Sequence, residues 1–254
     1  MKFYTLFQVY HGDLYLQGYE NGKRFREIQT HKPFLFVSSK NKSGSKYHTL
    51  DGKPVDRIDF NSNKEELSFK EKYSDIDGFE IYGMTGTLGA YSRVNDIFPG
   101  KIDYDPSLIR ILNFDIETGD DGTGGFPNIN EADKPVVSIT VTCQNKTFVL
   151  GCGEFDASGT DAKYIKCTSE ENLLTRFVEL WSLLDPDVVT GWNVEFFDIP
   201  YIYNRICKLI DKSFAQKLSP FRKIMHNDAE IRGRVINAIE VLGVVILDYM
   251  KLYK

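Results

Sequence analysis

The stretch ILNFDIETGD, residues 111–120, ends an apolar run with two carboxylates one residue apart, Asp115 and Glu117. From Leu108 onward the run is nearly continuously apolar, which is typical of a central strand covered on both faces. Side chains two residues apart on a strand point to the same face. The spacing therefore predicts that Asp115 and Glu117 project together, while Phe114 and Ile116 point into the core.

Two neighbouring carboxylates repel each other, and this repulsion raises a pKa or is relieved by a cation. Mg²⁺ prefers carboxylate oxygens, so a divalent metal site is one interpretation of the pair. The other interpretation is a strand that reaches solvent at this point, because such triplets are common by chance. The pair alone leaves both interpretations open.

The sequence around this strand predicts an α/β fold. Two alternating runs separated by a turn at residues 144–146 indicate a hairpin, and Ser169 is placed to cap a helix with an apolar stripe. A short buried strand and a second helix with Pro200 in its first turn follow. The segments are PVVSITVTC (135–143), KTFVLGC (146–152), SEENLLTRFVELWSLLD (169–185), PDVVTGWN (186–193) and FDIPYIYNRICKLI (197–210). Their order predicts a mixed sheet with helices packed on its faces.

The first hundred residues read as a smaller, strand-rich α+β module. Asn21-Gly22 between two strand-like runs is a hairpin signal, and a short exposed helix is expected to open at Ser62 or Asn63. The segment GKIDYDPSL then marks a boundary, so we expect one domain over residues 1–105 and another over 106–254.

Composition limits the class of protein. The chain has 254 residues, 42% of them hydrophobic, and a net charge of −5. This charge argues against a polycationic nucleic-acid coat protein but not against a nucleic-acid enzyme with acidic metal ligands beside a basic groove. With no apolar run of about 18 residues and no signal peptide, we expect a cytoplasmic protein without a membrane partner.

Cysteine and histidine give no sign of a metal or disulfide framework. The four cysteines show no C-x-x-C pair and are expected to be reduced. The four histidines are scattered and are predicted to be surface residues rather than ligands: His11, His31, His48 and His226.

A second acidic segment, TGWNVEFFDIPYIYNR at residues 190–205, repeats the arrangement of the first. A buried strand ends, a polar turn follows, and Asp198 stands at the start of a helix. An N-cap is the common role of an aspartate there. Aromatic residues crowd the turn, however, and Asn193 adds an amide suited to orienting a carboxylate.

Together, FDIET and GWNVEFFDIPYIYNR resemble the first and second exonuclease motifs of family B DNA polymerases, in the family's order and spacing. The resemblance is strongest for replicative polymerases of T-even-type bacteriophages, and KPFLFV and DGKPV extend it into the first hundred residues. It implies a ribonuclease-H-like exonuclease fold that removes 3′-terminal nucleotides with two metal ions held by four acids. Asp115 and Glu117 match the acids of the first motif, and Asp198 matches that of the second.

The resemblance implies two-metal phosphodiester hydrolysis, with Mg²⁺ or Mn²⁺ ions about 3.5–4 Å apart. One ion would generate a hydroxide from bound water and the other would stabilise the departing 3′ oxygen. Asp115 is expected to bridge both ions, Glu117 to complete one, and Asp198 to support the other, partly through water.

The fourth acid belongs to a third motif, in which a tyrosine precedes an aspartate by four residues, and no such pair follows Asp198. The later aspartates and the residues four before them are Asp211 and Cys207, Asp228 and Ile224, and Asp248 and Val244. We therefore expect an N-terminal, C-terminally truncated piece of a polymerase. It should bind divalent metal weakly and hydrolyse DNA slowly or not at all until the remainder of the polymerase completes the site.

The DNA contacts of such a site should be independent of sequence and directed to a single-stranded 3′ end or primer-template. Thr118, Phe126 and Phe197 are candidates to pack against or stack on terminal bases, with a core position as the alternative for the two phenylalanines. Asn193 in the second motif is a further candidate.

Residues 205–234 carry eight Lys and Arg against three acids, which indicates a solvated helix face or a phosphate-binding wall. Overlapping the end of this run, EIRGRVINAIEVLGVVILD (residues 230–248) alternates as a β-hairpin does. Relatives have a hairpin near this point that helps separate primer from template, so Arg232 and Arg234 are candidate DNA contacts. The alternative to an exonuclease is a non-catalytic nucleic-acid-binding or scaffold subunit of a split polymerase.

Overall fold

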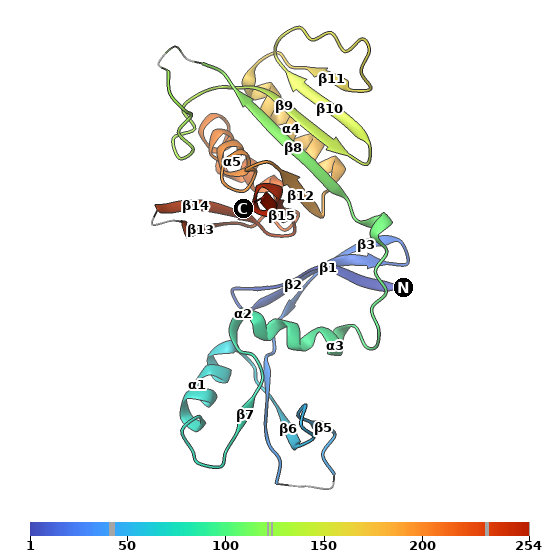
Figure 1. The fold of residues 1–254 in the computed structure, drawn as a ribbon, viewed down its shortest axis with the longest axis vertical. Helices are drawn as coiled ribbons and strands as arrows, with labels where there is room; N and C mark the ends of the chain where they lie inside the picture. Colours follow the sequence, from blue (N-terminus) through green and yellow to red (C-terminus); the bar gives the residue numbers. More distant parts are fainter. Residues whose placement is uncertain (41–43, 121, 123, 232–233, 254) are drawn as a thin grey trace. The chain divides into compact units, whose positions relative to one another are not determined.

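The computed structural model describes residues 1–40, 44–120, 122, 124–231 and 234–253. By its internal contacts the chain divides into two compact units, Met1–Asp105 and Pro106–Lys254 (Figure 1). Each unit is considered by itself below.

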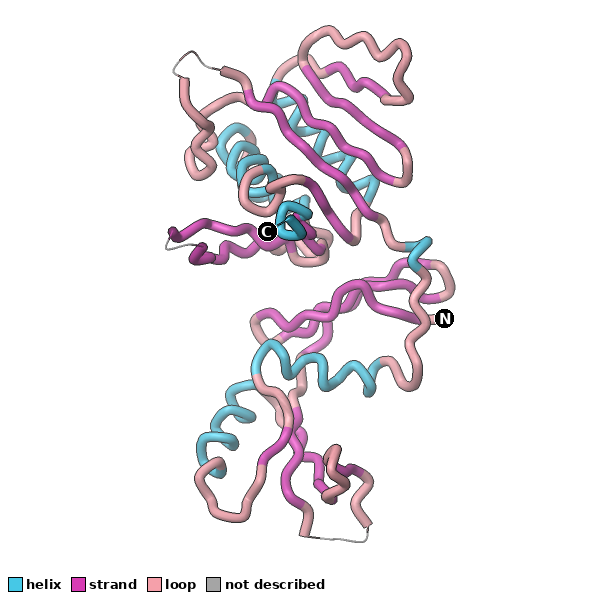
Figure 2. The backbone as a smooth tube through the Cα atoms, viewed as in Figure 1, coloured by secondary structure: helices cyan, strands magenta, loops and turns pink. Residues whose placement is uncertain are grey.

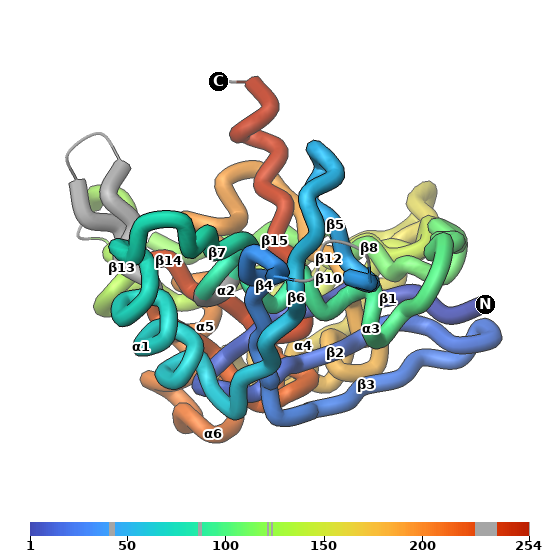
Figure 3. The backbone as a smooth tube through the Cα atoms, turned by 90° about the horizontal axis from the view of Figure 1, so that it is seen from below, coloured from blue at the N-terminus to red at the C-terminus, as the bar shows by residue number. Residues whose placement is uncertain are grey.

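The first unit opens with an antiparallel three-stranded sheet of β1 (Lys2–Tyr10), β2 (Asp13–Glu20) and β3 (Lys23–Thr30). The three strands lie side by side in both Figure 1 and Figure 3. The β2–β3 turn is Asn21-Gly22, with φ angles of 51° and 77°. Such left-handed pairs match the twist of a two-residue hairpin, which confirms the predicted turn.

A second sheet and several helices complete this unit. The sheet has the order β5-β6-β4-β7, with β4 at Phe34–Ser38, β5 at Tyr47–His48, β6 at Pro54–Asp59 and β7 at Ile81–Tyr82. The helices are α1 (Asn63–Tyr73), α2 (Gly86–Gly89), the 3₁₀ turn Ala90–Arg93 and α3 (Val94–Ile97). Ser62 caps α1 by accepting a hydrogen bond from the backbone N–H of Glu65. Of the two expected capping residues, Ser62 and Asn63, the structure therefore has Ser62.

His31 overturns the prediction that every histidine lies at the surface. It follows β3 and is only 2% exposed. Its backbone N–H donates to the carbonyl of Gly12, which draws the residue inward. Burial and the nearby Arg93 charge lower the pKa of the imidazole. A single histidine with no pattern around it gave no sequence signal for this position.

In the described part of the second unit, six strands form a mixed sheet in the order β11-β10-β9-β8-β12-β15. Their bounds are β8 Ile111–Thr118, β9 Val136–Cys143, β10 Lys146–Gly151, β11 Lys163–Lys166, β12 Val188–Gly191 and β15 Val245–Asp248. Strand β9 runs antiparallel to β8 and β10, whereas β8 with β12, β12 with β15, and β10 with β11 are parallel. This mixed α/β sheet is consistent with the expected ribonuclease-H-like exonuclease fold.

Local signals place the main elements of this unit. The β9–β10 turn is Gln144-Asn145, and both residues have positive φ, as the predicted hairpin requires. Ser169 caps α4 (Glu170–Leu184) through the backbone N–H of Asn172. The second predicted helix is α5 (Asp198–Leu209). Short elements follow it: α6 (Lys212–Ala215) and the 3₁₀ turns Gln216–Leu218 and Tyr249–Tyr253, with Pro106–Leu108 preceding β8.

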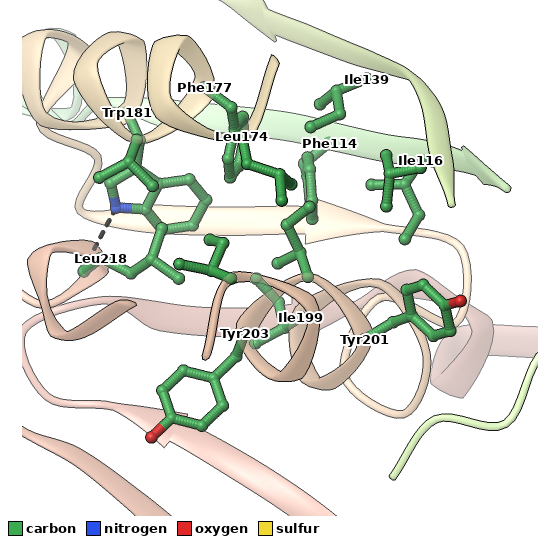
Figure 4. Close-up of a cluster of buried hydrophobic side chains, with 14 of the residues drawn as sticks. Phe114, Ile116, Ile139, Leu174, Phe177, Trp181, Ile199, Tyr201, Tyr203 and Leu218 are labelled. Atoms are coloured by element: carbon green, nitrogen blue, oxygen red, sulfur yellow. Dashed lines mark hydrogen bonds between the residues drawn. The ribbon is translucent and has the colours of Figure 1, made fainter. Parts of the chain in front are cut away.

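Helices α4 and α5 share one core with the sheet. Leu112, Phe114 and Ile116 of β8 are buried in it, and the Phe114 ring lies 5.1 Å from that of Phe177 (Figure 4). The indole N–H of Trp181 donates to the Leu218 carbonyl at 2.8 Å, which fixes the chain after α6 against α4.

The other face of β8 is open, so the prediction of a strand covered on both faces is wrong. Ile111 is 53% exposed, and Asn113, Asp115 and Glu117 are exposed on the same side. Exposed and buried positions alternate strictly from Ile111 to Glu117. An apolar residue at the exposed position 111 hid this alternation in the sequence.

A hairpin near the end of the chain is formed by β13 (Ile224–Ile231) and β14 (Arg234–Val241), which pair antiparallel (Figure 2). It begins six residues before the stretch predicted for it, residues 230–248, and the last residues of that stretch form β15 of the six-stranded sheet instead. Arg232 lies outside the described residues, and Arg234 is described by its backbone alone. Within the described ranges, no helix has the length and hydrophobicity needed to span a membrane.

Candidate active site

Three parallel strands bring their carboxyl ends to one edge of the sheet. Strand β8 ends at Thr118, β12 at Gly191 and β15 at Asp248, with Gly191 directly opposite Asp248. In open α/β sheets, functional groups gather at this edge because the loops leaving the strands meet there. The loops after β8 and β12 are seen at this edge in Figure 2.

Asp115 and Glu117 project together from the open face of β8, as the strand period predicts. Both are exposed, and their neighbours on β9 are the hydroxyl residues Thr140 and Ser138. Two carboxylates are therefore presented to solvent beside short polar side chains that leave room for a ligand.

Asp198 reaches the same strand from α5. Its carboxylate accepts a 3.0 Å hydrogen bond from the backbone N–H of Ile116, the residue between Asp115 and Glu117. Strand β12 pairs with β8 only as far as Asn113, so the N–H of Ile116 lies beyond its end. The N-cap interpretation of Asp198 is wrong, because Phe197 holds that position without a side-chain cap bond.

Burial and like charge act together on Asp198. The side chain is 3% exposed, and the pKa of its carboxyl is raised to about 7, chiefly by this burial and also by the charges of Asp115 and Asp248. The hydrogen bond from Ile116 favours the charged form and opposes this rise. A cation at the strand edge would relieve the repulsion.

The turn between β12 and α5 passes close over β8. A side chain at Gly191 would place its Cβ only 2.6 Å from the carbonyl oxygen of Phe114, so this approach needs glycine. Asn193 has a φ of 60°, a conformation that asparagine tolerates. Its carbonyl accepts from the N–H groups of Phe196 and Phe197 and leads the chain into α5.

Asp248 is a site residue that the sequence did not reveal. It is 5% exposed at the end of β15, and its carboxylate accepts from the backbone N–H groups of Asn193 at 3.0 Å, Met250 at 3.0 Å and Glu195 at 3.3 Å. Asn193 thus orients a carboxylate through its backbone rather than through its side-chain amide. The available signal is an acid at the end of an apolar run, LD at residues 247–248, whereas the expected third motif pairs its aspartate with a tyrosine.

Aromatic rings form a row at the start of α5. Phe126 is 82% exposed, and its ring lies 5.5 Å from that of Phe197. Phe197 in turn stacks on Tyr201 at 5.5 Å and is partly buried against the core. Phe126 is therefore an open surface ring, and Phe197 links it to the core.

Thr118 lines a hollow of about 240 Å³ at the end of β8. The hollow lies between the strand end and the glycine-rich segment that follows it. The other lining residues are Gly119, Asp120, Gly124, Gly125, Pro127 and Lys134.

Two cations at the start of the basic run bind within the protein. Arg205 is 7% exposed and forms an ion pair with Glu170 at 2.7 Å. Lys208 donates to the backbone carbonyls of Glu131 and Ala132. At the start of the run these cations hold neighbouring backbone in place, because α5 lies against it.

The donor chemistry of the site fits a hard divalent cation, since Asp115, Glu117 and Asp198 offer only carboxylate oxygens. Among the described residues, no three acids, histidines or cysteines lie close enough together to hold one ion. The Asp198 carboxylate is turned toward the backbone of β8 instead. Asp198 accepts from the N–H of Ile116, the residue between Asp115 and Glu117, but the three carboxylates do not form a three-ligand cluster.

Comparison with known proteins gives consistent matches. The model of the family described as DNA polymerase family B, exonuclease domain, matches residues 90–254. The chain is 32% identical to the DNA-directed DNA polymerase of Escherichia phage RB69 and 29% identical to that of Enterobacteria phage T4. These alignments cover 96% and 92% of the chain but 30% and 28% of the relatives. The DNA polymerase delta catalytic subunit of Caenorhabditis elegans is 30% identical over 56% of the chain and 14% of its own length.

Proposed function

Because the chain belongs to the family of the exonuclease domain of family B DNA polymerases, we propose that it supplies the 3′-5′ proofreading exonuclease of such a polymerase. The reaction is hydrolysis of the 3′-terminal phosphodiester of DNA. Residues 1–105 are then the polymerase's N-terminal domain, and residues 106–254 carry the first two exonuclease motifs.

The observation that carries this proposal is the meeting of the acids on β8. Asp198 binds the N–H of Ile116 at 3.0 Å, and that residue separates Asp115 from Glu117. Two segments more than eighty residues apart in sequence thus deliver their carboxylates to one strand end. Burial is the main cause of the raised pKa of Asp198, and the charges of Asp115 and Asp248 add to it. A bound cation would favour the charged form of this carboxyl.

Asp115, Glu117 and Asp198 would hold the Mg²⁺ or Mn²⁺ ions of the site. When bound, two such ions supply an activated water and stabilise the leaving oxygen of an in-line displacement. Asp115 is exposed on β8 and its charge acts on Asp198, so it would help to hold the ions. Asp198 stays anchored to β8 while it contributes.

The aromatic row receives the DNA end in this proposal. Phe126 is open to solvent and can stack on a terminal base, a contact that contributes about 1–3 kcal/mol and tolerates any base. Phe197 holds Phe126 from behind at 5.5 Å. Thr118 stands at the hollow beside the strand end, and Asn193, Arg232 and Arg234 remain proposed DNA contacts.

The chain spans about 30% of the length of the two phage relatives. We propose that the polymerisation activity lies in the remaining part of the polymerase, which is the protein partner of this chain. The tyrosine and aspartate of the third motif have no match after Asp198. We therefore expect slow or no hydrolysis by the chain alone, and activity once a polypeptide with the downstream polymerase sequence is added.

The test is degradation of 3′-labelled single-stranded DNA in Mg²⁺ or Mn²⁺, with and without that downstream polypeptide. The Asp115→Ala/Glu117→Ala variant removes the acids of β8. Glu154→Ala/Asp156→Ala is a matched control, because it removes the same two acid types at the same spacing from an exposed loop.

Activity that needs the downstream polypeptide, persists in the control and disappears in the β8 variant supports the proposal. Equal activity in the β8 variant would contradict it. If no combination hydrolyses DNA but the chain still binds it, the non-catalytic DNA-binding subunit becomes the better description.

A further inference from the structure

Lys134 is a buried cation between β8 and β9. Its side chain is 5% exposed, although a charged amine is costly to bury unless acceptors surround it. Its ammonium donates to the carbonyl oxygens of Gly125 at 2.9 Å and Gly124 at 3.3 Å. It also lies 3.7 Å from a carboxylate oxygen of Asp120.

All three of these partners belong to one segment, which we name the glycine loop. Its described residues are 119, 120, 122 and 124–127. Two of the partners are carbonyl oxygens within hydrogen-bond distance of the ammonium, and Asp120 is an ion-pair partner. The Lys134 ammonium therefore binds both the beginning of the loop, at Asp120, and its later part, at Gly124 and Gly125.

Lys134 is itself fixed on α5. Its backbone N–H donates to the Tyr201 hydroxyl at 2.9 Å, and that hydroxyl donates to the carbonyl of Lys134 at 2.6 Å. Arg205 donates to the neighbouring carbonyl of Ala132 at 2.7 Å. The position of the Lys134 ammonium is thus set by the helix that begins with Asp198.

The loop that Lys134 holds carries Phe126. At one end of the loop, the N–H of Gly119 donates to the Pro135 carbonyl at 2.7 Å. Phe126 then meets Phe197, the residue directly before Asp198. Lys134 therefore connects the loop that carries Phe126 to α5, the helix that begins with Asp198.

We propose that Lys134 is a positioning residue for the DNA 3′ end, holding the glycine loop so that Phe126 stays in place to stack on the terminal base. This inference rests on the proposed exonuclease function. Lys134 acts through its contacts with loop carbonyls and does not touch the reacting atoms.

The experiment compares the full chain with its Lys134→Met variant, which keeps the length of the side chain and removes the ammonium. Lys163→Met at the exposed start of β11 is the matched control. Phe126→Ala and the Lys134→Met/Phe126→Ala double variant complete a thermodynamic cycle. All five proteins are studied by hydrogen exchange of the loop and by binding of single-stranded DNA with 2-aminopurine at its 3′ end. Binding is measured in Ca²⁺ with the downstream polypeptide present.

In Lys134→Met, amides of the glycine loop should exchange faster while those of α4 keep their rates. Affinity for the labelled 3′ end should fall about tenfold, the size of one stacked base, and the 2-aminopurine quenching should weaken. In the double variant the affinity should fall no further than in Phe126→Ala. A merely structural role would not produce this non-additivity.

Unchanged loop exchange in Lys134→Met would overturn the proposal, and so would faster exchange with unaltered quenching or fully additive losses. Failure of the unaltered chain to bind any 3′ end would instead contradict the proposed function, and with it the role of Lys134 toward DNA. The exchange data separate the two failures, because they report on the loop without DNA.

Discussion

At the scale of single residues, the pKa of the Asp198 carboxyl is subject to two opposing effects. Burial and the neighbouring acids favour its protonated form, whereas the N–H of Ile116 favours the charged form. Burial dominates, so the pKa of this carboxyl is raised to about 7.

We predict that the carboxyl of Asp198 titrates near pH 7 in metal-free protein, as measured by carbon NMR of the side chain. Asp115→Asn removes a negative neighbour and should lower this midpoint, whereas Asp156→Asn in the exposed loop should leave it in place. Added Mg²⁺ should also lower it. A midpoint that does not move in Asp115→Asn would show that the two carboxylates do not sense each other.

The same shift fixes a sign for stability. The pKa of Asp198 is higher in the folded chain than its ordinary value of 3.8, so the folded state holds more protons between these values. The contribution of this residue to the free energy of unfolding is full below the ordinary value. It is lost as pH rises through about 7.

His31 gives the opposite pH dependence in the first unit. Burial and Arg93 lower its pKa below the ordinary 6.5, so the unfolded chain binds the proton more readily. The contribution of the neutral imidazole to the free energy of unfolding is full above pH 6.5. It is lost as pH falls below that value, by at most about 1.4 kcal/mol per pH unit. His31→Leu should therefore flatten the acid branch of urea unfolding curves followed between pH 5 and 8. His48→Leu at an exposed position is the control, and equal slopes in the two variants would refute the assignment.

At the scale of elements, local signals predicted what local interactions decide. Helix α4 began at its serine cap, and the β2–β3 and β9–β10 turns formed where residues that tolerate positive φ stand between strand-like runs. The role of Asp198 depended on a hydrogen bond to Ile116, 82 positions away, which no local pattern encodes. The same holds for Asp248, whose partners in the β12–α5 turn lie about 55 residues earlier.

Asp248 should control the conformation of the β12–α5 turn. Asp248→Ala leaves the partly buried N–H groups of Asn193 and Glu195 without their acceptor, and the loss of such a hydrogen bond costs about 1 kcal/mol. Asp248→Asn keeps one acceptor oxygen and should lower the melting temperature less. In the alanine variant, hydrogen exchange should quicken over residues 192–198 and stay unchanged in β9–β10. Equal stability of the two variants would contradict this role.

At the scale of the whole molecule, the fold class and the family were predicted correctly, because the two acidic motifs and the order of strands and helices can be recognised in the sequence alone. It did not show that β8 is open on one face, since the apolar side chain of Ile111 resembles a core residue. Nor did it show that Arg205 is internal, because a charge run cannot reveal which cations face a partner such as Glu170. Both depend on how α4 and α5 lie on the sheet.

The open face of β8 is also what makes the molecule testable as a metal-binding protein. Paramagnetic broadening of backbone NMR signals by Mn²⁺ detects even weak binding and locates it residue by residue. We predict that Mn²⁺ first broadens the amides of Asp115, Ile116, Glu117 and Asp198, and that the Glu154→Ala/Asp156→Ala control behaves in the same way. Asp115→Ala/Glu117→Ala should abolish this localised broadening. If that variant retains it, or if broadening in the unaltered chain centres elsewhere, the carboxylates of β8 are not the metal site and the proposed exonuclease chemistry is contradicted.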